Sequence, residues 1–191
     1  MSIVSTIKMT ARQFLDLGED PAGVRLELVN GEVAVSPSPL PKHSFVVSAL
    51  LRILGNHVEA HKLGALFGDL DTLVDDFFVR RPDILYFAEN RLHLVGEKAV
   101  EGPPDLCVEV ISPTSEAIDR DDKFAEYQDF SVPNYWLVDP AQRTFEAFQL
   151  RRKKYTSVVR GQGADIVHAP PFPELAIPLG ELWWQPRKRR Q

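Results

Sequence analysis

The chain has 191 residues, of which 44% are hydrophobic and 26% charged, and its formal net charge is −5. This composition is typical of a globular domain and excludes disordered and fibrous chains. The acidic net charge argues against a protein that coats nucleic acid through a uniformly basic surface. Because no apolar stretch reaches the roughly 20 residues of a membrane helix, we expect no membrane partner.

The cysteine content and the first residues indicate a location for the protein. A single cysteine, Cys107, excludes an intramolecular disulfide and any zinc site built from several thiolates. The first ten residues lack the basic start, apolar stretch and cleavage site of a secretory signal. Both features favour the cytoplasm. We expect one folded domain over residues 1–185 and a basic, disordered tail over residues 186–191.

The charge is distributed unevenly along the chain. Residues 1–140 carry a net charge of −11, whereas residues 141–191 carry a net charge of +6. Two basic runs, 151–154 and 187–190, supply most of this excess. One interpretation is a solvated hairpin turn and a solvated tail. The other is a set of phosphate contacts, which requires the fold to gather the basic side chains.

The N-terminal segment predicts a short helix followed by a β-hairpin. Thr10 and Gln13 form a capping-box pattern, which predicts a helix that runs through Leu17. Asn30-Gly31 lies between two short alternating segments, 25–29 and 32–35. Since this dipeptide tolerates positive φ at both turn positions, it predicts a hairpin.

A long helix and several strands follow. The proline-rich residues 36–41 cannot continue a strand ladder or a helix, and apolar residues at helical spacing then predict a helix over residues 44–60. Short segments rich in β-branched and aromatic residues predict strands. These segments are residues 71–74, 84–87, 106–111 and 135–138.

Residues 115–130 predict a helix between the last two of these strands. Its expected apolar stripe consists of Ile118, Phe124, Tyr127 and Phe130, and its expected solvent face of Asp119, Asp121 and Asp122. The order strand, helix, strand predicts a crossover that makes the two strands parallel. Finally, residues 144–148 and 155–159 predict an antiparallel hairpin closed by the first basic run.

Two carboxylates stand out as candidates for chemistry. Glu109 lies inside the apolar strand, and Asp83 lies at the start of an earlier strand, where it could be a simple turn residue. Glu109 requires a partner, because an uncompensated buried carboxylate costs several kcal/mol. A divalent cation is one candidate, since two carboxylates, a carbonyl and waters suit Mg²⁺ or Mn²⁺. A salt bridge to Arg or Lys is the alternative.

These acids also carry a resemblance. Pro82-Asp83, followed after 26 residues by Glu109 in an apolar strand and then by a helix, resembles the PD-(D/E)XK nuclease superfamily. More narrowly, the chain from about Thr10 to Leu150 resembles the Uma family of bacterial restriction-endonuclease-like proteins. The stretches that carry this likeness are residues 27–32, 81–83, 104–113 and 135–140. It implies a mixed α/β fold, with a central mixed β-sheet flanked by helices.

One position departs from the superfamily pattern. The lysine expected two residues after the second acid is replaced by Ile111. In the Uma family this lysine comes from the following helix, and Lys123 would provide it here. The alternative is a solvated lysine that pairs with Asp119, four residues earlier.

The resemblance implies a set of site residues. Asp83, Glu109 and the Val110 carbonyl would hold Mg²⁺ or Mn²⁺, and Lys123 would orient the attacking water. Glu27 matches a family acid that would complete the outer metal shell, although it could instead be an exposed hairpin residue.

His43 would lie at the edge of the site, although beginning the long helix is an equally adequate role for it.

Three functions remain open at this point. The first is a metal-dependent endonuclease with DNA as its partner, for which a homodimer would supply the two sites that double-strand cutting needs. The second is an inactive binding or assembly module of the same fold, which Ile111 favours. The third is an unrelated α/β protein with a structural ion pair at Glu109.

Overall fold

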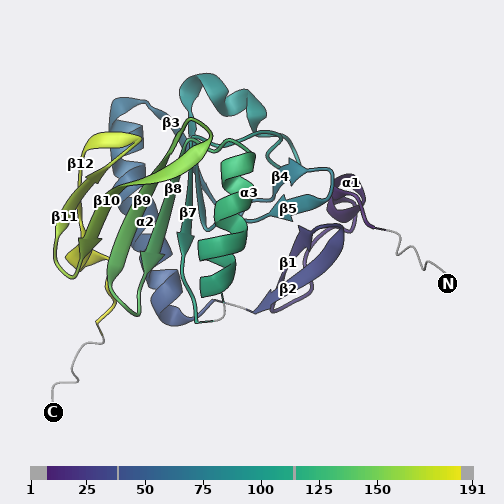
Figure 1. The fold of residues 1–191 in the computed structure, drawn as a ribbon, viewed down its shortest axis with the longest axis horizontal. Helices are drawn as coiled ribbons and strands as arrows, with labels where there is room; N and C mark the ends of the chain where they lie inside the picture. Colours follow the sequence, from purple (N-terminus) through teal and green to yellow (C-terminus); the bar gives the residue numbers. More distant parts are fainter. Residues whose placement is uncertain (1–7, 38, 114, 186–191) are drawn as a thin grey trace, which may run out of the picture.

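A six-stranded mixed sheet forms the centre of the protein (Figure 1). The computed structural model describes residues 8–37, 39–113 and 115–185. The strand order is β10-β9-β8-β7-β6-β3, and only β7 and β8 are parallel among these described neighbours. The bounds are β3 (Gly64–Gly68), β6 (Ile84–Ala88), β7 (Leu106–Val110), β8 (Asn134–Asp139), β9 (Thr144–Arg151) and β10 (Lys154–Gln162). The predicted crossover and the terminal hairpin are therefore confirmed.

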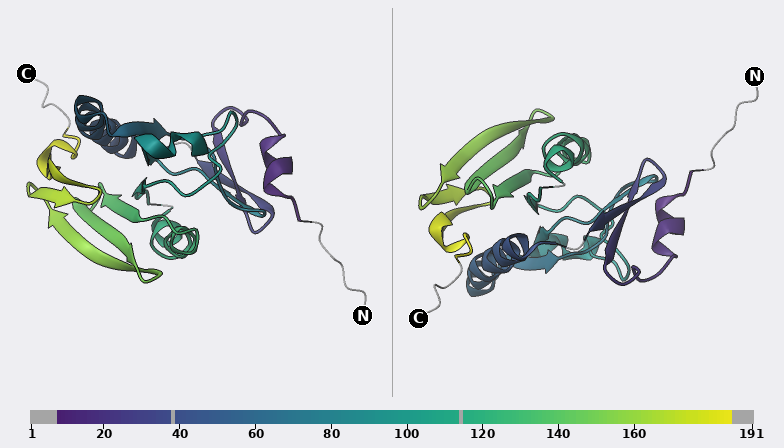
Figure 2. Two further views of the ribbon diagram at one scale, coloured as in Figure 1. Left: turned by 90° about the horizontal axis from the view of Figure 1, so that it is seen from above. Right: turned by 90° about the horizontal axis from the view of Figure 1, so that it is seen from below.

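Helices cover both faces of this sheet (Figure 2). Alternate residues of a strand point to opposite faces, so each central strand contributes to two cores. In β8, Trp136 and Val138 belong to the core of α2 (Pro41–His61), whereas Tyr135 and Leu137 belong to the core of α3 (Lys123–Asp129). The predicted long helix is thus confirmed, and it begins at Pro41 within the proline-rich stretch.

The predicted helix over residues 115–130 contains a π-helical turn, η2 (Ile118–Asp122), directly before α3. A π turn closes i→i+5 hydrogen bonds and so shifts which side chains face inward. The prediction is wrong for two residues: Ile118 is 38% exposed, and Asp119 is 1% exposed. Asp121 and Asp122 are exposed, as predicted.

A smaller, four-stranded sheet with the order β2-β1-β5-β4 contains the first hairpin. Its strands are β1 (Val24–Val29), β2 (Glu32–Pro37), β4 (Thr72–Asp75) and β5 (Phe78–Arg80). Asn30 and Gly31 have φ values of 52° and 78°, as their turn requires. Thr10 and Gln13 form the predicted capping box before α1 (Ala11–Leu15), whose Phe14 packs on Leu28 of β1.

Several elements have no counterpart among the sequence-based predictions. They are β3, β5, η1 (Glu89–Leu94), β11 (Ile166–Ala169), β12 (Phe172–Pro178) and η3 (Leu179–Glu181). The strands among them are short, and β12 contains prolines that interrupt its alternation. The predicted tail of residues 186–191 lies outside the described residues. None of the described helices is both long and apolar enough to cross a membrane.

Candidate active site

Sheet register places Asp83 and Glu109 side by side. In the antiparallel pair β6 and β7, Ile84 lies opposite Val108, so Asp83 and Glu109 occupy the next position of the two chains. Alternation directs both carboxylates to the face that α3 covers, the face of Leu85 and Cys107. Both side chains are buried. The two acids that the sequence singled out are therefore neighbours.

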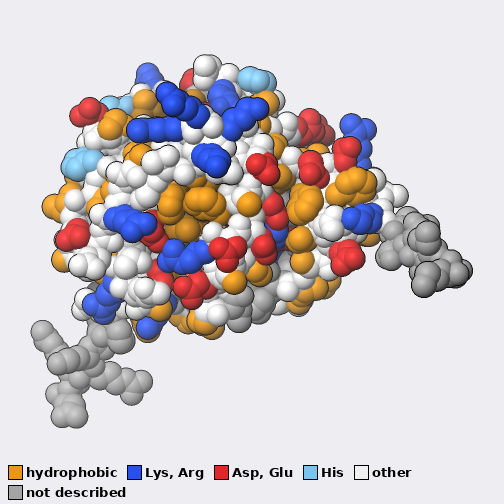
Figure 3. All heavy atoms as spheres, viewed as in Figure 1, with side chains coloured by type: hydrophobic (Ala, Val, Ile, Leu, Met, Phe, Trp, Pro, Cys, Tyr) orange, Lys and Arg blue, Asp and Glu red, His pale blue; other side chains and the backbone are white. Residues whose placement is uncertain are grey.

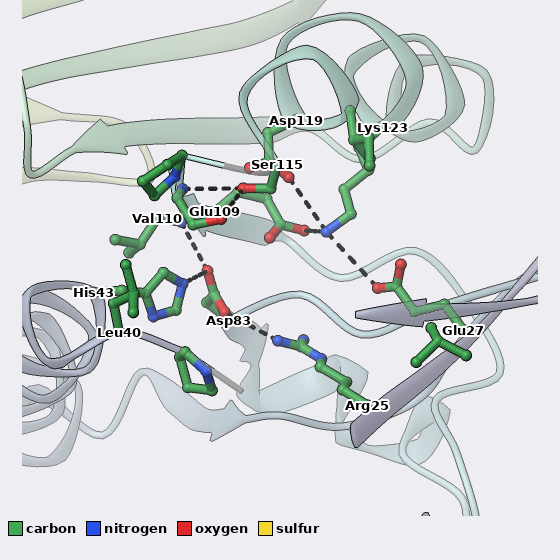
Figure 4. Close-up of a pocket in the computed structure, with 15 residues that line it drawn as sticks. Arg25, Glu27, Leu40, His43, Asp83, Glu109, Val110, Ser115, Asp119 and Lys123 are labelled. Atoms are coloured by element: carbon green, nitrogen blue, oxygen red, sulfur yellow. Dashed lines mark hydrogen bonds and ion pairs between the residues drawn. The ribbon is translucent and has the colours of Figure 1, made fainter. Parts of the chain in front are cut away.

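Lys123 reaches this pair from α3 (Figure 4). Its Nζ lies 3.0 Å from Glu109 Oε1, 3.4 Å from Asp119 Oδ1 and 3.7 Å from Glu27 Oε1. Lys123 is buried, so the alternative of a solvated lysine is wrong, although the pairing with Asp119 is present. These carboxylates outweigh burial and raise the pKa of Lys123, which keeps it a cation.

Glu27 comes to the site from β1, in the smaller sheet. Its Oε2 accepts a 3.0 Å hydrogen bond from Arg80 Nη1, and its Oε1 accepts a 3.0 Å hydrogen bond from the backbone N–H of Arg81. The side chain is buried, which excludes the exposed alternative. Burial opposes ionisation, but Lys123 and Arg80 hold the pKa of Glu27 below its ordinary value.

Asp83 is held from three sides. Its Oδ2 accepts a 2.8 Å hydrogen bond from the Val110 N–H and lies 3.1 Å from His43 Nε2, while Oδ1 lies 3.3 Å from Arg25 Nη1. Burial disfavours the charged form, yet His43 and Arg25 lower the pKa of Asp83. His43 thus lies in the first turn of α2 and also touches the site. Its Nδ1 is buried and has no hydrogen-bond partner among the described residues.

Glu109 has the opposite pKa shift from Asp83. Its Oε1 accepts a 2.9 Å hydrogen bond from the Tyr127 hydroxyl. Burial raises the pKa of Glu109 to about 8; Lys123 opposes this rise, and the charges of Asp119 and Asp83 add to it. Two adjacent carboxyl groups with divergent pKa values are common at functional sites.

The converging side chains surround a hollow of about 350 Å³, which we call the site hollow. The Asp, Glu, His, Lys and Arg side chains in its lining are Arg25, Glu27, His43, Asp83, Glu109, Asp119 and Lys123. A second hollow of about 510 Å³, the adjoining hollow, shares Arg25, His43 and Asp83 with it. The site is therefore open on the side of Arg25.

The donor set suits a hard divalent cation that keeps much of its own water. Among the residues that the structure describes, no group of three or more His, Cys, Asp and Glu side chains is arranged to hold a metal ion. However, Asp83 and Glu109 are adjacent oxygen donors, and Val110 lies beside them in the lining. The buried Asp119 Oδ1 accepts no hydrogen bond from any described residue, and Lys123 Nζ lies 3.4 Å from it, so this oxygen could still accept a hydrogen bond. Such a small set of oxygen donors fits Mg²⁺ or Mn²⁺, because these ions are usually held by one or two carboxylates and keep several of their own water molecules.

Comparison with known proteins identifies the family. The family model described as "Putative restriction endonuclease", Uma2, matches residues 11–180. The chain belongs to the Uma2 family. This membership confirms the resemblance found in the sequence and excludes an unrelated α/β protein.

A solved structure supports the fold of this Uma2 chain. It is described as a putative nuclease from Anabaena variabilis ATCC 29413, and it matches with a TM-score of 0.75 at 21% identity. The match covers 92% of this chain and 97% of the other, and at this identity it shows the fold. The predicted mixed α/β fold is confirmed. A comparison with curated proteins gives no match.

The Uma2 chain also has site residues that the sequence patterns did not reveal. Arg25 lies two residues before Glu27 on β1, so the same alternation that turns Glu27 inward turns Arg25 toward the site. Tyr127 lies four residues after Lys123, on the same helical face. Arg80 carries no such signal. It donates a two-pronged pair of hydrogen bonds to Glu126, of 2.6 and 2.7 Å, while binding Glu27.

Proposed function

We propose that this Uma2 protein is a metal-dependent endonuclease that hydrolyses DNA phosphodiester bonds. The observation that carries this proposal is the position of Lys123. Although Ile111 occupies the usual lysine position, the ammonium group of Lys123 lies 3.0 Å from Glu109 Oε1, next to Asp83. The acids and the cation of the nuclease pattern therefore meet in one hollow.

Asp83, Glu109 and the Val110 carbonyl are the groups that would hold Mg²⁺ or Mn²⁺. When bound, this metal polarises the scissile phosphate and lowers the pKa of a water molecule. Lys123 stays positive, so it acts as a hydrogen-bond donor and counter-charge rather than as a base. Glu27, held by Arg80, keeps the ammonium group over the acids.

A second candidate function, nucleic-acid binding without catalysis, is favoured by the ion pairs of the site. Lys123 and Arg25 already neutralise Glu109 and Asp83, as a purely structural salt bridge would. Metal-dependent cutting separates the two functions, because only a nuclease must both accept a divalent ion at these carboxylates and cut DNA with it. Cutting of both DNA strands would further require two sites, which a homodimer would provide.

The test is nicking of supercoiled plasmid DNA with Mg²⁺ or Mn²⁺, together with calorimetric titration of Mn²⁺. We expect the unmodified protein to nick the plasmid, and Glu109→Gln or Asp83→Asn to lower the rate by about 10²–10³-fold. Arg52→Gln is the control, because Arg52 is exposed and its ion pair is with Glu181. Nicking by Glu109→Gln at the unmodified rate would overturn the proposal. Mn²⁺ binding without nicking would favour the binding module.

A further inference from the structure

Arg25 lies between the site hollow and the adjoining hollow and contributes to the lining of both. Its Nη1 lies 3.3 Å from Asp83 Oδ1, and its Nε lies 3.3 Å from Asp69 Oδ1. In spite of these contacts, Nε and Nη2 are buried and donate no hydrogen bond to any described residue. A buried, charged donor without an acceptor is unfavourable, which indicates that an acceptor belongs there.

The other cationic side chains around the two hollows are already engaged. Lys123 faces three carboxylates, Glu27, Glu109 and Asp119. Arg81 pairs with Asp71 and Asp20. Of the Lys and Arg side chains lining either hollow in the described part of the chain, only Arg25 has buried nitrogens with unused donors.

The chemistry of the unused donors selects an oxyanion. Nε and Nη2 form one edge of the guanidinium group, and the two parallel N–H bonds of such an edge match two oxygens of a phosphate. Figure 4 shows Arg25 and Lys123 reaching the acids from different elements, β1 and α3. An anion held by Arg25 would therefore lie beside Asp83, on the side that opens to the adjoining hollow.

We propose that Arg25 binds a backbone phosphate of the nucleic acid next to the bond that is cut. This inference rests on the proposed nuclease function and names the residue that positions its substrate. Asp69 competes for the same edge of the guanidinium group, but it is 69% exposed and its contact makes no hydrogen bond. A phosphate is therefore able to replace Asp69 at little cost.

The test measures binding of a short fluorescein-labelled DNA duplex by anisotropy, with Ca²⁺ present and over a series of salt concentrations. We expect Arg25→Gln to weaken binding about tenfold and to reduce the salt slope by about one. Arg25→Lys should lie between the two, since it keeps the charge and loses the paired donors. Asp69→Asn should tighten binding about twofold, because it removes the competing carboxylate.

Two controls keep folding and function separate from this role. Arg52→Gln, on the exposed side of α2, should bind as the unmodified protein does, and thermal unfolding checks that each variant is folded. Asp69→Asn leaves Arg25 intact, so it tests the inference even where Arg25→Gln fails to fold.

Unmodified protein that binds the duplex through Arg25 and never cuts it would contradict only the nuclease function. Protein that cuts, but binds equally well with Arg25→Gln or more weakly with Asp69→Asn, would overturn only the role of Arg25. Absence of duplex binding by the unmodified protein would also overturn that role.

Discussion

The two ends of the six-stranded sheet carry charge in opposite ways. At the end where β7 and β8 finish, the charged side chains of the site, Glu27, Glu109, Asp119 and Lys123, are buried and in contact. At the other end, the turn between β9 and β10 presents Arg151, Arg152, Lys153 and Lys154, all exposed. The side chains of the last three make no hydrogen bond or ion pair within the described part of the chain. Figure 3 shows Lys and Arg side chains gathered over this end.

This comparison decides how the first basic run can act. β9 begins beside Asp139, at the site end of β8, and runs away from it, so the basic turn lies at the far end of the sheet from Glu109. The fold gathers these four charges, but away from the site hollow. Exposed charges are screened by salt and act almost independently, whereas buried charges depend on one another for their stability. The second basic run, 187–190, lies outside the described residues.

The largest expected effect is a loss of stability when the cation shared by the buried carboxylates is removed. Lys123→Met would leave Glu27, Glu109 and Asp119 without the cation they share. We expect the free energy of unfolding to fall by about 3–5 kcal/mol in urea denaturation, since removal of one partner leaves uncompensated buried charge. At the exposed end, Lys154→Met should change it by less than about 0.5 kcal/mol.

Coupling within the buried end gives this prediction its control. Glu109→Gln added to Lys123→Met removes one of the stranded carboxylates, so the double variant should recover part of the lost stability. If the double variant instead lost the sum of the unfolding free energies lost by Lys123→Met and Glu109→Gln alone, the charges at this end would be as independent as those of the basic turn, contrary to the comparison.

A smaller effect compares two tyrosine hydroxyls, one near each end of the sheet. Tyr127 donates a 2.9 Å hydrogen bond to Glu109, and Tyr155 donates one of the same length to the Val132 carbonyl. We expect Tyr127→Phe to lower the free energy of unfolding by about 1.5–2 kcal/mol and Tyr155→Phe by about 1 kcal/mol, because the first leaves a buried carboxyl oxygen with one donor fewer. Urea denaturation of both variants measures the difference. Equal losses of unfolding free energy would show that the hydrogen bond to the Glu109 carboxyl group stabilises the fold no more than the one to the Val132 carbonyl.

Local patterns predict the acids of the site better than their partners. Glu109 is visible in the sequence because a carboxylate interrupts an apolar strand, and Asn30-Gly31 fixes its hairpin within a few residues. The inward turn of Asp119 is not visible, because it depends on the π turn rather than on α-helical spacing. Arg80 is equally hidden: it belongs to the three-residue strand β5, whose pairing with β1 is set by tertiary packing.

The smallest expected effect compares the two hairpin turns and concerns the exposed end alone. Arg152 and Lys153 have φ values of 51° and 65°, close to the left-handed pair that Asn30 and Gly31 adopt. Long side chains adopt this conformation at a cost, whereas Asn-Gly is favoured in such turns. Arg152→Asn combined with Lys153→Gly should therefore raise the free energy of unfolding by about 1 kcal/mol, measured in urea. Because the turn is remote from Glu109, plasmid nicking should change by less than about twofold at moderate salt. A less stable double variant would mean that the two basic side chains stabilise the turn in spite of their exposure. A large loss of nicking would mean that the basic turn and the site hollow both contact the DNA.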